Sequence, residues 1–302
     1  MQNTGRSLRE CRGFTLAELA IALVIVALLL ASALIPLSAQ IELKSVADTK
    51  KTMDQIQESL LGFAIANGRL PCPADGSIAD GASTAGQEIA NCDNSAATKL
   101  SYGVVPWATL GVPATDAWGR RFSYRVAPVF ADSIGTTFTT TAISDFNSRS
   151  SLSSAAQATT CTPSPTPTQS SIALCTVGNL SVYTRSDSTR TASSVATFVA
   201  AVVISHGKNG YGARTPAGTV FSAPASGTDE YQNADGGHPS AFGSTSPTTF
   251  VFMSRNPSPA PPATATCNET STSSYPCEFD DIVAWIHPAL LVSRMLTAGK
   301  LP

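Results

Sequence analysis

The first part of the chain carries one long apolar run, from Phe14 to Leu37, whose only ionisable side chain is Glu18. About 20 consecutive apolar residues are enough to cross a bilayer as a helix. The run therefore predicts a transmembrane helix over residues 14–37. A proline inside a helix removes one backbone hydrogen bond and favours a bend, so Pro36 marks a candidate bend near the end of the run.

Beyond this run, apolar residues recur at helical spacing and no turn signal intervenes. Polar and charged residues occupy the other face, and the pattern ends at Asn67-Gly68, a typical helix stop. We expect residues 38–67 to continue the first helix and to pack on a globular domain of residues 68–302. A plain anchor joined to an unrelated helix is the alternative, but no linker separates the two parts. The apolar stripe consists of Val46, Met53, Ile56, Leu60, Phe63 and Ala64.

Later segments show the patterns of strands. Apolar and polar residues alternate over 121–126, as in a strand with one buried face. The nearly continuous apolar run 195–205 predicts a central strand buried on both faces. Residues 249–253 and 279–286 predict further strands, and Pro288 opens a last helix that reaches Gly299. The expected fold class is α+β, with the long helix packed on a mainly antiparallel sheet that has long, disulfide-tied loops.

The charge pattern orients the chain. Arg6, Arg9 and Arg12 outweigh Glu10 in the segment before the apolar run, which predicts that this leader stays in the cytoplasm and that the rest is exported. The 302 residues carry a net charge of −2, and only 13% are charged. No cluster of Lys and Arg follows the leader, so we predict no nucleic-acid partner.

The placement of Gly13 departs from that of an ordinary signal peptide, whose small-residue cleavage site follows the apolar region. Here the small residue precedes it, in Gly13-Phe14-Thr15-Leu16-Ala17-Glu18-Leu19. This stretch resembles the G-F-T-L-x-E-L motif of type IV prepilins and type II secretion pseudopilins. The resemblance implies that a prepilin peptidase cuts between Gly13 and Phe14, removes the leader 1–13, and leaves Phe14 to be N-methylated. Residues 116–126 also resemble the D-x-W-G turn and strand of major pseudopilins.

Glu18 has two interpretations. An acid in the membrane is expensive and is usually functional. It either extends toward the cytoplasmic interface, or it pairs with the amino terminus that cleavage creates at Phe14 of a neighbouring subunit. The resemblance favours the second interpretation.

The resemblance implies a structural subunit of a type IV pilus-like or type II secretion pseudopilus filament. Such a subunit is a single-pass protein of the bacterial inner membrane with its C-terminal domain in the periplasm, and it later joins an extracytoplasmic filament of other pilin or pseudopilin subunits. The large exported domain favours a minor subunit. The alternative is a membrane-anchored periplasmic binding protein or enzyme. We expect no enzyme, because the three histidines lie in separate loops and no paired-carboxylate motif occurs. His206 belongs to no arrangement of a Ser or Cys nucleophile with a base, and is interpreted as a structural loop histidine.

Seven cysteines are present, and Cys11 falls in the leader. An even number in an oxidising compartment indicates disulfides, with fifteen connectivities for six cysteines. Closeness in sequence favours three short loops. Zinc-ligand spacing does not occur. The six cysteines, paired as we expect, are Cys72–Cys92, Cys161–Cys175 and Cys267–Cys277.

One loop groups oxygen donors: Asp229, Glu230, Asn233 and Asp235. Carboxylate and amide oxygens suit Ca²⁺, and the resemblance to major pseudopilins, which carry a calcium loop late in the chain, supports calcium as a cofactor. A solvated acidic loop is the alternative.

Overall fold

The computed structural model describes residues 15–90, 92, 100–131, 172, 178–234, 238–239 and 250–300, with positions 30–39 and 238–239 described by their backbone only. The chain divides into two compact units, Met1–Ala47 and Asp48–Pro302.

Helix α1 runs from Leu16 to Asn67 as one helical assignment that includes Pro36. It ends where the sequence predicts, and Gly68 follows with φ of 69°. Within the second unit, Met53, Ile56 and Leu60 of this helix are fully buried. The expectation that the amphipathic part packs on the globular domain is therefore confirmed for residues 48–67. Among the residues described, no helix is both long and apolar enough to cross a membrane.

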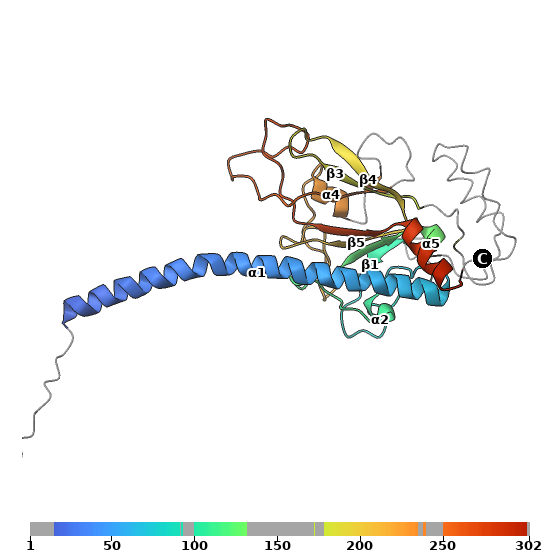
Figure 1. Cartoon of the computed structure of the whole chain (residues 1–302), viewed down its shortest axis with the longest axis horizontal. Coiled ribbons are helices and arrows are strands. Elements are labelled where there is room, and N and C mark those ends of the chain that lie inside the picture. The colour runs from blue at the N-terminus through green and yellow to red at the C-terminus, as the bar shows by residue number, and fades with distance from the viewer. Residues whose placement is uncertain are drawn as a thin grey trace, which may run out of the picture. The chain divides into compact units, whose positions relative to one another are not determined.

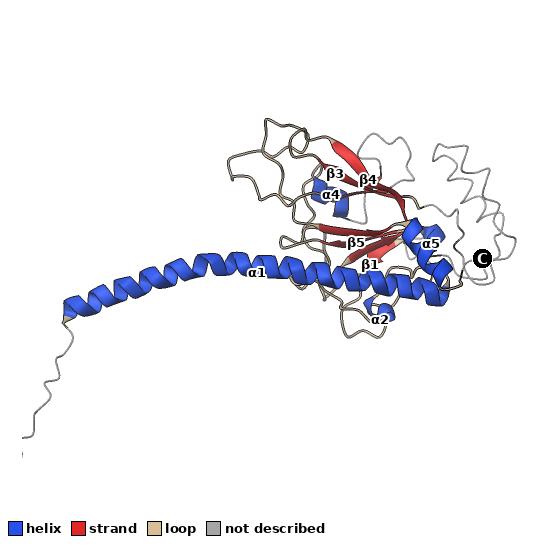
Figure 2. Cartoon of the chain, viewed as in Figure 1, coloured by secondary structure: helices blue, strands red, loops and turns tan. Residues whose placement is uncertain are grey.

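In the described part of the chain, eight strands form two four-stranded sheets. Figure 2 draws the strands in red. The first sheet has the order β1-β2-β5-β8 and is antiparallel throughout. The second has the order β4-β3-β7-β6, in which β3 and β7 are parallel. The α+β class is thus confirmed, with two sheets in place of one. The strands are β1 Tyr102–Val104, β2 Ser123–Val126, β3 Leu180–Arg185, β4 Ala192–Val199, β5 Ala201–Ser205, β6 His238–Pro239, β7 Phe250–Met253 and β8 Ile282–Ile286.

Among its described residues, the second unit also contains short helices: α2 Trp107–Leu110, the 3₁₀ turn η1 Pro128–Phe130, α4 Asp229–Asn233 and α5 Pro288–Thr297. Helix α5 begins at Pro288, as predicted, and the side chain of His287 caps it by accepting a hydrogen bond from the Ala289 amide. Leu291 and Met295 are buried in the same core as Met53, Ile56 and Leu60 of α1. Figure 1 shows α5 beside the C-terminal end of α1.

The predicted central strand over 195–205 is wrong in its extent. The structure divides the run between β4, in the second sheet, and β5, in the first. Phe198 has φ of 60°, outside the strand region, and the Ala200 amide donates to the carbonyl of Ile286. Of these two strands, β5 is buried along its whole length and lies between β2 and β8.

The polar side of the 121–126 segment is also buried, contrary to the expected half-exposed strand. Arg121 is completely buried, and its guanidinium donates to three backbone carbonyls and to Asp80. Arg125 is 4% exposed and stacks over the ring of Phe250. Loops and the second sheet cover the face of this segment that the sequence pattern predicts to be exposed to solvent.

The disulfides Cys72–Cys92 and Cys267–Cys277 are present, which confirms two of the three predicted pairs. The third, Cys161–Cys175, lies outside the described residues. The predicted Asp116 turn is also confirmed. Asp116 Oδ1 accepts hydrogen bonds from the amides of Trp118 and Arg120, and Gly119 has φ of 78°.

Candidate functional sites

Helix α1 begins with a reciprocal cap between Thr15 and Glu18. The Thr15 amide and hydroxyl each donate to Glu18 Oε2 at 2.9 Å, and the Glu18 amide donates back to the Thr15 hydroxyl at 3.2 Å. This is a capping box, which satisfies two amides at the helix start. The T-x-x-E spacing of Thr15 and Glu18 is the sequence signature of a capping box, but the sequence analysis did not predict one. Gly13 and Phe14 lie outside the described residues.

The helix that follows this cap exposes large apolar side chains in the first unit. Such a surface is unfavourable in water unless lipid or another protein covers it. The most exposed of these residues are Leu16, Leu43, Leu28 and Leu29, at 88%, 71%, 66% and 64%.

The loop predicted to bind calcium forms the short helix α4, whose cap is the Thr228 hydroxyl bonded to the Tyr231 amide. Asp229 starts this helix but faces guanidinium groups. Arg185 Nη2 donates to Asp229 Oδ1 at 2.8 Å, and Arg255 Nε donates to Oδ2 at 2.7 Å. Both oxygens of Asp229 are therefore engaged by cations.

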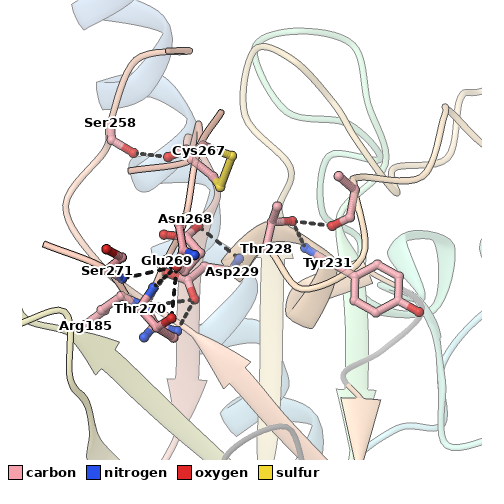
Figure 3. The surroundings of a disulfide bond; sticks show 12 residues. Arg185, Thr228, Asp229, Tyr231, Ser258, Cys267, Asn268, Glu269, Thr270 and Ser271 are labelled. Atoms are coloured by element: carbon pink, nitrogen blue, oxygen red, sulfur yellow. Dashed lines mark hydrogen bonds and ion pairs between the residues drawn. A yellow bond between two sulfur atoms is a disulfide. The ribbon is translucent and has the colours of Figure 1, made fainter. Parts of the chain in front are cut away.

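The disulfide-closed loop 267–277 supports this arrangement. Figure 3 shows Asp229 and Arg185 close to the residues that follow Cys267. Glu269, in that loop, accepts hydrogen bonds from the Asp229 amide and from Arg255, each at 3.2 Å. The ion-pair network thus ties α4 to β3 and to the disulfide loop.

Glu230, the next residue, faces other carboxylates. One oxygen from each of Glu230, Asp280 and Asp281 lies within 4.8 Å of the others. Glu230 is 3% exposed and Asp281 is 5% exposed. The sequence reasoning missed Asp280 and Asp281, because they lie about 50 residues beyond Glu230. The only signal was the adjacent acid pair at the start of a predicted strand.

The side-chain amides of two asparagines hold this acidic cluster in place. Asn209 Nδ2 donates to Glu230 Oε1 at 2.7 Å. Asn233 Nδ2 donates to Asp281 Oδ2 at 2.8 Å, and the same side chain exchanges hydrogen bonds with the backbone of Met253 in β7. Of the four predicted calcium ligands, Glu230 is in the cluster, Asn233 supports it and Asp229 faces away from it. Asp235 lies outside the described residues.

The electrostatics of the cluster follow from its burial. Burial and the negative charges of Asp281 and Asp280 raise the pKa of Glu230 to about 8, although the hydrogen bond from Asn209 opposes this shift. Burial, together with the charges of Asp281 and Glu278, raises the pKa of Asp280 to about 6. Like charges in a buried site destabilise the ionised forms. A bound cation would reverse this effect.

His206 lies beside the cluster and is 1% exposed. Its Nδ1 is 3.6 Å from Asp281 Oδ1, and its Nε2 is 2.8 Å from the hydroxyl of Ser123 in β2. The structure therefore brings a serine to His206 that is far from it in sequence. Ser123 also lines a cleft of about 510 Å³, together with Asp75, Tyr102 and Arg214.

Comparison with known proteins places the recognisable part of the chain at its N-terminus. Neither the curated proteins nor the solved structures include a significant match. Residues 8–34 match the family model described as the prokaryotic N-terminal methylation motif. The chain therefore carries the N-terminal signal of type IV pilins and pseudopilins.

Proposed function

We propose that the chain is a minor structural subunit of a type IV pilus-like or type II secretion pseudopilus filament. The observation that carries this proposal is the match of residues 8–34 to the methylation motif. A prepilin peptidase removes residues 1–13, Phe14 is N-methylated, and the apolar helix holds the subunit in the inner membrane until assembly. The role is structural and not enzymatic, and the globular domain faces the periplasm.

The exposed apolar side chains of α1 support this proposal, since they provide a surface on which sister helices pack in the filament. The same side chains contact lipid before assembly. A helix that is apolar on its exposed faces suits both environments.

The cap geometry supports the pairing role of Glu18. Both donors of Thr15 go to Oε2, so within the described residues Oε1 stays open to a cation. The new amino group at Phe14 of a neighbouring subunit supplies such a cation. In an apolar surrounding, this charge pair aligns one helix against the next.

Mass spectrometry of the mature protein tests the processing step. We expect a chain that begins at Phe14 with one added methyl group. Replacement of Gly13 by Leu should retain the leader and leave Phe14 unmethylated. A mature protein that begins at Met1, or that is cut near Ala39, would contradict the proposal.

Crosslinking tests assembly. Cysteines placed along residues 19–34 should give crosslinked products between neighbouring copies in cells. Glu18→Gln should abolish these products while the variant is still processed. Asp54→Asn removes an exposed acid of the same helix and is the matched control, which should crosslink like the parent.

A further inference from the structure

The strongest unexplained feature of the globular domain is the buried cluster of Glu230, Asp280 and Asp281. We propose that these three carboxylates bind one divalent cation of the Ca²⁺ class, and that the cation joins the two sheets. The ligands come from α4 and from the segment before β8. They do not form the single calcium loop at 229–235 that the sequence predicts.

Unpartnered oxygens within the cluster point to a ligand. Among the described residues, Asp280 Oδ1 and Asp281 Oδ1 are buried and have no hydrogen-bond partner. A buried acceptor without a partner costs the desolvation of that group, about 1–3 kcal/mol and more when it is charged. A cation that coordinates both oxygens removes this penalty.

The spacing of the carboxylates is compatible with Ca²⁺. Ca²⁺ binds oxygen at about 2.3–2.6 Å, so two oxygens on one ion lie at most about 5 Å apart. The three carboxylate oxygens lie within 4.8 Å of one another, which meets this limit. Mg²⁺ requires shorter bonds and near-octahedral geometry and keeps several waters, so a largely buried, three-carboxylate site suits it less well.

The surroundings of the site are built to hold these side chains. Gly207 has φ of 56°, and a Cβ at this position would overlap the backbone carbonyl of Asp280. The backbone N–H of Asn209 donates to Asp280 Oδ2 at 2.8 Å. The side chain of Asn233 orients Asp281 by donating to its Oδ2. His206, held by Ser123, lies next to Asp281 Oδ1 and acts as a positioning residue.

The position of the site in the fold gives the cation its structural role. Asn233 fixes α4 to Met253 of β7, in the second sheet. Asp281 precedes β8, in the first sheet. An ion shared by Glu230 and Asp281 therefore connects both sheets.

The test uses the purified full chain after treatment with a chelator. Calorimetric titration with Ca²⁺ should show one ion bound per chain, and Ca²⁺ should raise the melting temperature. Hydrogen exchange at the backbone amides of α4 should slow when Ca²⁺ is added. Mg²⁺ and Zn²⁺, added separately, should bind more weakly than Ca²⁺.

Isosteric variants locate the site. Asp281→Asn and Glu230→Gln should each weaken Ca²⁺ binding at least tenfold and remove most of the melting shift. Both remove a repulsive charge, so we expect them to fold, and circular dichroism checks this. Glu58→Gln alters an exposed acid of α1 outside the cluster and should bind Ca²⁺ like the parent.

Several outcomes would overturn this proposal. One is that the parent chain, titrated to about 10 mM Ca²⁺, the weak end of protein calcium sites, gives neither binding heat nor a melting shift. Another is that both folded variants bind as the parent does. Tighter binding of Mg²⁺ or Zn²⁺ would reject the Ca²⁺ class. The measurement is independent of leader cleavage, so it can succeed or fail separately from the proposed filament role.

Discussion

Asp229 and Glu230 are adjacent in the chain, yet their carboxylates have opposite surroundings. Asp229 accepts hydrogen bonds from the guanidinium groups of Arg185 and Arg255. Glu230 lies with Asp280 and Asp281. One short helix thus takes part in both an ion-pair network with two arginines and a cluster of three carboxyl groups.

Loss of the Asp229 carboxylate should strongly destabilise the domain. The variant Asp229→Ala leaves two guanidinium groups, with side chains 5% and 3% exposed, without their shared acid. Breaking a buried pair in this way costs about 3–5 kcal/mol. Urea unfolding followed by circular dichroism measures the difference. The matched control is Glu58→Ala, because Glu58 is 67% exposed and its pair with Arg294 is worth about 0–1 kcal/mol. Equal losses in the two variants would contradict the assignment.

The chelator-treated chain should lose stability as the pH rises. In the folded state the pKa of Glu230 rises from 4.5 to about 8, and that of Asp280 rises from 3.8 to about 6. A carboxyl group with a raised pKa contributes stability at low pH, and this contribution is lost as the pH rises through the folded value. As the pH rises from about 5 to 8, the melting temperature of the parent chain should therefore decrease more than that of Glu230→Gln. A parent and a variant with parallel pH profiles would refute this prediction.

The buried face of α1 should contribute strongly to stability. Ile56 is completely buried, and its replacement by Ala should cost about 2–5 kcal/mol through lost contacts and the cavity left behind. Gln55, its exposed neighbour, provides the control, since Gln55→Ala should change the free energy of unfolding by less than about 0.5 kcal/mol. Denaturant midpoints of the two variants give the comparison. A small effect at Ile56 would mean that this part of the helix is not packed in solution.

Removal of either described disulfide should destabilise the domain by about 2–5 kcal/mol. The Cys72–Cys92 bridge joins residues 20 apart, whereas Cys267–Cys277 joins residues 10 apart. The longer loop should contribute about 0.5 kcal/mol more through chain entropy. Paired Cys→Ser variants, unfolded in guanidinium, measure both effects. The Cys267–Cys277 variant should also loosen Glu269 and its contact with Arg255, which hydrogen exchange in the loop would reveal.

Local signals predicted the elements whose environment is local. The stop at Asn67-Gly68, the Asp116 turn and the start of α5 at Pro288 all depend on residues within a few positions of one another, and the structure has each of them. The two described disulfides also close short loops, so proximity in sequence was a good guide to them.

Long-range contacts explain the failures. The alternation of polar and apolar residues predicts that Arg121 and Arg125 are exposed to solvent. In the structure, a distant loop covers Arg121 and Phe250 covers Arg125. The acidic cluster unites residues about 50 positions apart, which no local spacing reveals. The 195–205 run is uniformly apolar, so its division between two sheets depends on the backbone at Phe198 and on pairing with β8.

The hydrogen bond from Gln57 to the carbonyl of Trp285 joins residues 228 positions apart. During synthesis, the apolar stripe around Gln57 emerges long before β8 and α5, which complete its core. Contacts of such separation make folding slow, and early apolar segments are prone to aggregate while they wait. The core around residues 53–64 therefore cannot be completed until residues 282–297 have been made.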